Sequence, residues 1–189
     1  MARPKSDNKR KAILEATLRV FAEHGITHAP TSAISKAAGV AEGSLFTYFK
    51  TKDELMNELY REMRQDFDRA LVNFPYQADA RTRMRFMWDR FVDLGVAHPE
   101  RVTVMKQLRA SGHLLKENET PGMMILELLN AIRDAIGWRE FSDVSLEFMI
   151  LLLRAQAEAT IEFILAHPEQ EAHGRELGFT LIWRGMAGQ

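Results

Sequence analysis

Two short helical segments joined by a glycine are the sequence feature that most limits the fold of this chain. One begins at Thr31 and ends at Gly39, and the next runs from about Glu42 to Phe49. Helices this short are unstable alone, so they must pack on other elements. Gly39 can adopt the left-handed conformation of a sharp turn, and Val40 can fill the angle between the helices. The pattern predicts a helix-turn-helix whose core face holds Ile34, Ala37, Leu45 and Phe49.

The rest of the chain has helical periodicity and little strand pattern. A first helix should end at His24-Gly25, because glycine commonly terminates helices. The run Thr51-Lys52-Asp53-Glu54 indicates a capping box, which starts a helix that we expect to reach Phe74. Further helices are expected at residues 78–98, 99–111, 121–137, 142–167 and 169–185. The prediction is an all-α protein of about nine helices, with a helix-turn-helix domain followed by a larger helical domain.

Composition excludes several classes of protein. The 189 residues include 46% hydrophobic residues, enough for a core, but no apolar run of the length that spans a membrane. Cysteine is absent, which removes disulfides and thiolate chemistry and fits a reducing compartment. We therefore expect a cytoplasmic protein with no membrane partner.

Charge is divided unevenly along the chain. Residues 1–53 carry nine Lys/Arg and five Asp/Glu, a net charge of +4, and residues 54–189 carry a net charge of −5. A basic head on an acidic body is expected when only the head meets a polyanion. We predict a DNA-binding domain at 1–53 and a ligand-binding and dimerisation domain at 54–189.

The second helix of the pair presents groups suited to a DNA groove. Its exposed positions hold small or hydrogen-bonding residues, which match a groove floor of donors and acceptors. Lys52 opposes the helix dipole at the start of its helix, an effect that a docked phosphate would reverse. Thr31, expected as the cap of its helix, offers a hydroxyl to another phosphate. The exposed positions are Glu42, Gly43, Ser44, Thr47 and Tyr48.

Three stretches resemble the DNA-binding signature of the TetR family: Phe21 to Gly25, Ile34 to Val40, and Gly43 to Leu55. The resemblance covers nearly all of residues 8–58. It implies backbone contacts by Thr31, Gly43, Phe46, Tyr48 and Lys52, and base reading by Ser32, Glu42, Ser44 and Thr47. Ala41 and Phe46 depart from the usual Ser and Tyr, so two hydroxyls that reach phosphates are missing. The basic arm at residues 2–5 is a further candidate for DNA contact, although such arms are often disordered.

A homodimer is predicted from the last two helices. The segment 142–167 is apolar almost all round, which indicates burial on two sides. With the apolar positions of the last helix it can form a four-helix interface across a two-fold axis, as the resemblance also implies. The alternative is that both helices are central in a monomer. The predicted interface residues are Leu151, Leu152, Phe179, Ile182 and Trp183.

A pocket for an apolar small molecule is predicted from Met and aromatic residues at helical spacing. Methionine adapts to varied shapes, and aromatic faces stack on planar or cationic compounds. The alternative is that these side chains are core. A further resemblance, to multidrug-sensing repressors of the same family, implies ligand stacking by Tyr60, Trp88 and Phe163. The candidates are Tyr60, Met63, Arg64, Phe67, Met84, Trp88, Phe91, Thr160 and Phe163.

No catalytic or metal-binding motif stands out. Only His24 and His28 among the six histidines have helical pair spacing, and a glycine turn separates them. We expect no enzyme activity, no metal and no cofactor. The prediction is a homodimeric repressor that binds a palindromic operator in double-stranded DNA and is released by a small-molecule inducer. The alternatives are a helical homodimeric protein-interaction module and a helical enzyme without a DNA role.

Overall fold

The computed structural model describes residues 4–119, 125–127, 129–130, 133 and 146–187. Every regular element with bounds in these ranges is a helix, so the predicted all-α fold is confirmed. Most of the helix expected at 121–137 and the start of the one expected at 142–167 lie outside the described residues. The chain forms two compact units, Met1–Gln65 with Glu100–Thr120, and Asp66–Pro99 with Pro121–Gln189.

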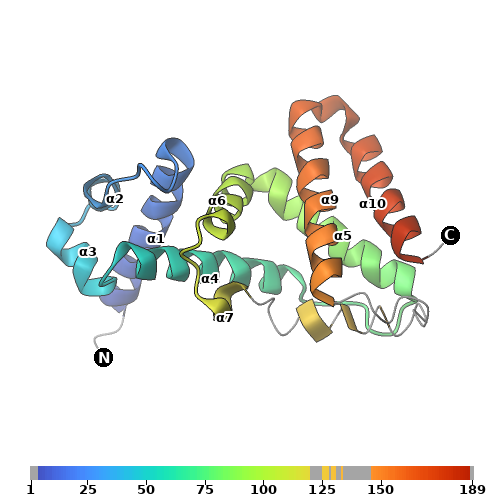
Figure 1. Ribbon diagram of the computed structural model, residues 1–189, viewed down its shortest axis with the longest axis horizontal. Helices are drawn as coiled ribbons and strands as arrows, with labels where there is room; N and C mark the ends of the chain where they lie inside the picture. Colours follow the sequence, from blue (N-terminus) through green and yellow to red (C-terminus); the bar gives the residue numbers. More distant parts are fainter. Residues whose placement is uncertain (1–3, 120–124, 128, 131–132, 134–145, 188–189) are drawn as a thin grey trace. The chain divides into compact units, whose positions relative to one another are not determined.

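The first unit begins with the predicted helix-turn-helix (Figure 1). It comprises α1 (Pro4–His24), α2 (Thr31–Ala37) and α3 (Glu42–Tyr48). Gly25 and Gly39 have φ angles of +73° and +65°, so both turns use the left-handed conformation that glycine tolerates. The buried core residues include Ile13, Phe21, Ile34, Leu45 and Phe49. The prediction for Ala37 is wrong: it is exposed as the last residue of α2, and Ala38 packs against the core instead.

The predicted pairing of Thr51 and Glu54 at the start of α4 (Lys52–Ala70) is confirmed, although Glu54 reaches back to the N–H of Lys50 rather than to that of Thr51. The Thr51 hydroxyl accepts the Glu54 N–H at 3.0 Å, and the Glu54 carboxylate accepts the Lys50 N–H at 2.6 Å. The far end of the helix differs from the prediction, because α4 ends at Ala70 rather than Phe74. Leu71 and Phe74 are both buried, and the chain turns between them through Asn73 at φ 70°.

Two buried asparagines join α4 to the segment after α6 (Pro99–Ala110), which contains the short helix α7 (Lys116–Glu119). The Asn57 amide nitrogen donates to the carbonyl oxygens of Asp53 at 2.8 Å and His113 at 3.0 Å. Its oxygen accepts the Leu115 N–H and the Asn118 amide, both at 2.8 Å. Each polar atom of the Asn57 side chain is therefore satisfied in a buried position.

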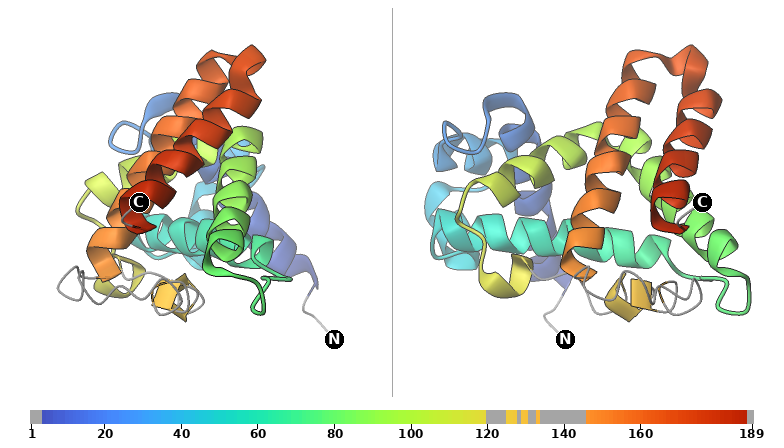
Figure 2. Two further views of the ribbon diagram at one scale, coloured as in Figure 1. Left: turned by 90° about the vertical axis from the view of Figure 1, so that its right-hand side faces the viewer. Right: turned by 45° about the vertical axis from the view of Figure 1, so that its right-hand side comes forward.

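The second unit packs α5 (Ala80–Ala97) against α9 (Leu146–Ala166) and α10 (Glu171–Ala187). The short 3-10 helix Pro168–Gln170 connects α9 to α10, and these two helices run side by side in opposite directions (Figures 1 and 2). Glycines allow the close packing. A Cβ at Gly95 would lie 2.2 Å from Ile161 Cδ1, and one at Gly178 would lie 2.3 Å from Thr160 Oγ1.

Helix α9 has one buried face and one exposed apolar face. Ala157, Ile161 and Ile164 are buried, whereas Leu151 is 44% and Leu152 is 45% exposed. We expected both sides of α9 to be covered. Within the described part of the chain, the side that carries Ala157, Ile161 and Ile164 is covered, and the side that carries Leu151 and Leu152 is exposed. None of the helices in the described part of the chain has the length and hydropathy needed to cross a membrane.

Candidate nucleic-acid interface

Helix α3 has a fixed inner face and an open outer face. Leu45 is fully buried, and Phe49 at the end of the helix is 1% exposed. On the outer side, Phe46 is 38% exposed, and Glu42, Gly43 and Thr47 are also exposed. Ser44 and Tyr48 are half-buried, as is Thr31 on α2, whereas Ser32 is exposed. The inner contacts hold the helix in place while the outer groups are accessible to a partner.

The first residues of α2 and α3 are joined by a hydrogen bond. The Thr31 hydroxyl donates to Oε1 of Glu42 at 3.0 Å. The expected capping role of Thr31 is wrong, because the cap position of α2 is Pro30 and no side chain caps the helix. Thr31 lies one residue later, inside the helix, and its hydroxyl points to the carboxylate rather than to its own backbone. This contact was not predicted, since nothing in the sequence pairs the two positions.

Thr47 also uses its hydroxyl within the chain. It donates to the Gly43 carbonyl oxygen at 3.0 Å, one turn earlier on α3. The hydroxyl oxygen is left as an acceptor beside the methyl group. On the outer face of α3, Glu42 is therefore the group with the strongest capacity to accept a hydrogen bond.

The ammonium of Lys52 lies against the loop between α1 and α2. It donates to the carbonyl oxygens of Ile26 and Ala29, both at 2.7 Å, and lies 5.8 Å from the centre of the Phe21 ring. Desolvation by partial burial lowers the pKa of Lys52, although the neighbouring Asp53 carboxylate acts in the opposite direction. The sequence predicted the position of Lys52 at the helix start but missed these two carbonyl partners.

The loop before α2 has a second support, from α6. The Ile26 N–H donates to Oε1 of Gln107 at 3.3 Å. Lys52 thus binds two carbonyl oxygens of this short loop, and Gln107 binds a backbone N–H of the same loop. The sequence does not predict this role of Gln107, because a single glutamine on an amphipathic helix carries no pattern.

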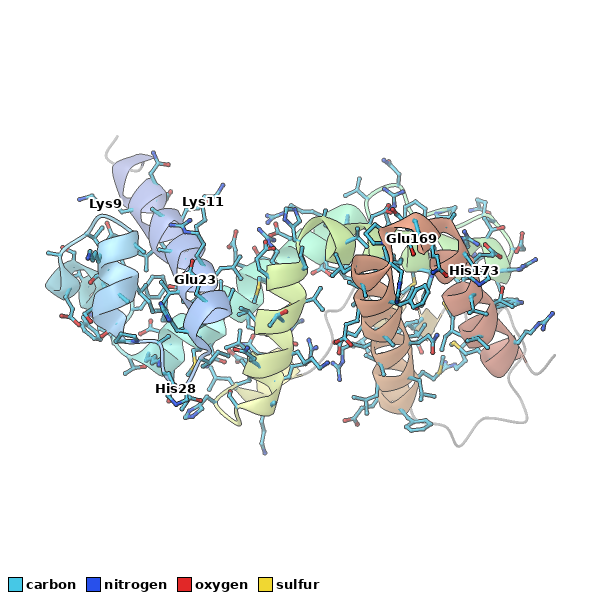
Figure 3. All side chains as sticks on the ribbon, turned by 90° about the horizontal axis from the view of Figure 1, so that it is seen from above. Lys9, Lys11, Glu23, His28, Glu169 and His173 are labelled. Atoms are coloured by element: carbon cyan, nitrogen blue, oxygen red, sulfur yellow. The ribbon has the colours of Figure 1, made fainter. Side chains whose placement is uncertain are left out.

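Basic residues of α1 have different roles. Arg10 forms an ion pair with Glu58 of α4 and lies 5.6 Å from the Phe49 ring centre, so it links α1 to α4 and to the end of α3. Lys9 and Lys11 are exposed on the first half of the helix, with His28 in the loop that follows (Figure 3). The exposed ammonium groups of Lys9 and Lys11 add to the positive charge that the sequence assigns to the head.

The predicted ligand residues are divided between the two units. In the first unit, Tyr60 and Met63 are buried in the core cluster, and the Arg64 guanidinium donates to the Asn118 carbonyl at 3.2 Å. In the second unit, Phe67 and Phe91 form an edge-to-face pair at 5.0 Å. Their assembly into one ligand site stays a prediction. The remaining candidates, all in the second unit, are Met84, Trp88, Thr160 and Phe163.

Trp88 has a clear packing role in the second unit. It is 3% exposed, and its indole N–H donates to the Arg175 carbonyl oxygen at 3.1 Å. A Cβ at Gly178 would come within 2.7 Å of its ring. Met84 and Thr160 are also buried, whereas Phe163 is 38% exposed. The structure therefore places Trp88 between α5 and α10, where it stabilises their contact.

The predicted interface residues differ in accessibility. Leu151 and Leu152 are exposed on α9, and Ile182 and Trp183 are half-buried on α10. Phe179 differs from the expectation: it is 1% exposed and its ring lies under the guanidinium of Arg85, 4.9 Å away. The exposed apolar residues of α10 are instead Leu177 and Leu181.

The geometry defines a helix-turn-helix head joined to a second helical unit. Residues 13–59 match the family described as bacterial regulatory proteins, tetR family. The fatty acid metabolism regulator protein of Bacillus subtilis is 30% identical over 111 residues, 58% of this chain and 57% of that protein. The aligned segments cover between 24% and 57% of the length of such curated relatives.

Solved structures are similar over nearly the whole chain. A tetR family transcription regulator from Shewanella sp. PV-4 has a TM-score of 0.77 at 26% identity, covering 94% of this chain and 97% of that one. FadR from Bacillus subtilis in complex with stearoyl-CoA has a TM-score of 0.66 at 21% identity, covering 95% and 98%, and shows a shared fold. Residues 13–59 are thus similar to the tetR family, and the chain shares the fold of these solved regulators. Both relatives are named as regulators.

Proposed function

We propose that this protein is a homodimeric transcriptional repressor that binds a palindromic operator in double-stranded DNA and leaves it when a small apolar molecule binds. The observation that carries the proposal is the geometry of α3. Its inner face is fixed by fully buried Leu45, and its outer face is open along Glu42, Gly43 and Thr47. A short helix held this way after a glycine turn is suited to enter a major groove.

The proposed contacts divide into two groups. Thr31, Gly43, Phe46, Tyr48 and Lys52 would lie against the phosphate backbone, and Ser32, Glu42, Ser44 and Thr47 would face the bases. Lys52 has three ammonium N–H groups, and two of them bind loop carbonyls. One N–H remains for a phosphate, so this proposed contact is compatible with the observed geometry.

The dimer is supported by the exposed apolar face of α9 and α10. Leu151, Leu152, Leu177 and Leu181 are each more than 40% exposed. Exposed apolar area of this kind is favourable to bury against a second copy. Two copies would present two reading heads, and a two-fold operator needs them about one DNA turn, roughly 34 Å, apart.

The proposed inducer is an apolar compound of the planar or cationic multidrug type, bound by the aromatic and methionine residues predicted from the sequence. The similarity to the Bacillus subtilis fatty acid metabolism regulator makes long-chain acyl compounds a second candidate class. Titration of the DNA complex with a planar cationic dye and, separately, with stearoyl-CoA distinguishes the two. Release by one compound and not by the other identifies the class, and release by neither removes both.

Capture of genomic DNA fragments tests the DNA-binding function directly. Purified protein is mixed with sheared genomic DNA at low salt, and the retained fragments are sequenced. We expect enrichment of a palindrome, with affinity that falls steeply as salt rises. Thr47→Glu, which adds a negative charge to the outer face of α3, should abolish capture. Val72→Glu adds a similar charge in the turn after α4, where Val72 is 61% exposed and lies outside the proposed DNA and dimer surfaces, and should not. Uniform recovery of all fragments, or none, would reject the proposal.

A further inference from the structure

One carboxylate stands on the outer face of α3. Glu42 is the only acidic residue between Thr31 and Lys52, a stretch that also holds Lys36 and Lys50. It is exposed, and the described residues give it one hydrogen-bond partner, the Thr31 hydroxyl at 3.0 Å from Oε1. The bond holds one carboxylate oxygen toward α2, which leaves Oε2 to accept a hydrogen bond from outside the chain.

Space around the carboxylate favours close approach of a base pair. The next residue, Gly43, has no side chain, and a Cβ built there would meet no atom within 4 Å. The first turn of α3 can therefore come near a groove floor with Glu42 as its leading side chain. The Thr47 hydroxyl donates its proton to the Gly43 carbonyl oxygen within α3. It therefore does not act as a second hydrogen-bond donor to a base at this surface.

The chemistry of the major groove then limits which base Glu42 accepts. A carboxylate only accepts hydrogen bonds, so guanine N7 and O6 and thymine O4, all acceptors, repel it. Adenine offers its N6 amino group, but the neighbouring N7 is an acceptor. Cytosine offers its N4 amino group with no acceptor beside it on the same base edge. An unpaired carboxylate brought close to DNA is unfavourable, so every other base is penalised.

We infer that Glu42 is a specificity-determining residue that selects cytosine at one position of each operator half-site, and that Thr31 is the positioning residue that orients its carboxylate. This inference rests on the proposed DNA-binding function and deepens it. Phosphate contacts change affinity equally for all sequences, whereas a base contact changes it at one base pair. The two roles are therefore separable by measuring sequence preference as well as affinity.

Selection from a random pool of duplexes tests the role of Glu42. The wild type should require a C·G pair at one position of each half-site, and replacing that pair should weaken binding about tenfold. Glu42→Gln should change the preferred base there from cytosine to adenine, because an amide both donates and accepts. Glu42→Ala should lose preference at that position alone. Identical selected sites for all three proteins would overturn the inference and leave the DNA-binding function standing. Selection of no site by the wild type would reject both.

Thr31 is tested by a conservative pair of variants. Thr31→Ser retains the hydroxyl and should keep the cytosine preference, whereas Thr31→Val removes it and should weaken that preference severalfold. Thermal unfolding of each variant confirms that the head is folded. If Thr31→Val weakens binding to all duplexes equally with the preference unchanged, Thr31 acts only through its proposed backbone contact and does not position Glu42.

Discussion

The ammonium of Lys52 donates to the carbonyl oxygen of Ala29 at 2.7 Å, and so ties the start of α4 to the loop before α2. A second bond of equal length reaches Ile26. A cation at a helix start opposes the helix dipole, and in the sequence this conflict indicated a docked phosphate. The two carbonyl oxygens also offset the unfavourable interaction of Lys52 with the helix dipole, because they place partial negative charge around the ammonium. Lys52 therefore has a structural role that needs no DNA.

Lys52→Met should lower the free energy of unfolding by about 1–2 kcal/mol, because it removes two charge-assisted hydrogen bonds from a partly buried site. Lys36→Met is the matched control. Lys36 is exposed on α2, so its loss should change stability by no more than about 0.5 kcal/mol. Denaturant unfolding measures both values. Equal stability of the two variants would mean that the Lys52 bonds contribute nothing to the fold.

The same Lys52→Met variant separates the structural role from phosphate contact. If the third ammonium N–H binds a phosphate, the slope of log affinity against log salt should become shallower by about one per half-site. If Lys52 acts only by holding the loop, affinity falls while the slope stays the same. A binding titration at four or five salt concentrations distinguishes these results.

Local signals in the head allowed most of its structure to be predicted. The turn at Gly39, the end of α1 at Gly25 and the capping box of Thr51 and Glu54 each depend on residues close in sequence, so their patterns are readable. The bonds from Lys52 to Ile26 and Ala29 join residues 26 and 23 positions apart, and no local pattern encodes them. The end of α4 was missed for a similar reason. Leu71 and Phe74 have helical spacing, but the chain buries both side chains by turning at Asn73 instead of continuing the helix.

The predicted ligand residues show a different limit. Helical spacing correctly indicates the inward positions of Met84 and Trp88, which are buried, but not that of Phe163, which is 38% exposed. It does not distinguish a side chain that lines a cavity from one that fills it, because both are apolar and both face inward. Trp88 illustrates the second case, since its indole N–H is bound to Arg175 and its ring faces Gly178.

The capping box should contribute measurably to the stability of the head. Thr51→Ala removes the oxygen that accepts the Glu54 N–H, and caps of this kind are worth about 0.5–2 kcal/mol. Thr51→Ser keeps the oxygen and should remain within a few tenths of a kcal/mol of the wild type. Thermal unfolding followed by circular dichroism compares the two variants. A serine variant as unstable as the alanine variant would show that the methyl group, and not the hydrogen bond, matters at this position.

Asn57 and Asn118 should be energetically coupled. Asn57→Ala leaves the Leu115 N–H without its acceptor and leaves the Asn118 amide with only the Asn57 carbonyl oxygen, at 3.4 Å; a buried unsatisfied group costs about 1–3 kcal/mol. Asn118→Ala should cost less, because it leaves only part of the Asn57 oxygen unsatisfied. The double variant should lose less unfolding free energy than the sum of the losses in the two single variants. A double-mutant cycle in denaturant detects this difference. Strict additivity would mean that the Asn57–Asn118 hydrogen bond contributes no coupling.

Two glycines of α10 should respond in opposite ways to the same substitution. In Gly178→Ala the new Cβ would lie 2.3 Å from Thr160 Oγ1 and 2.7 Å from Trp88 Cζ2, so α10 must shift away from α5 and α9. The expected cost is about 1–3 kcal/mol. Gly185→Ala places its Cβ where no atom lies within 4 Å, so it should stabilise the helix by about 0.5–1 kcal/mol. Melting temperatures that move in the same direction would contradict the close packing at Gly178.

The exposed apolar face of α9 should be needed for self-association. Leu152 is 45% exposed, and Leu152→Glu would place a charge in the proposed interface, where its desolvation is unfavourable. We expect the variant to be a folded monomer by sedimentation velocity while the wild type is a dimer. Val72→Glu is the control, because Val72 is 61% exposed in the turn after α4 and lies outside the proposed interface. It should leave the dimer intact. If the wild type is itself monomeric at micromolar concentration, or if both variants are dimers, α9 is not the dimer interface. The two-fold operator would then require another explanation.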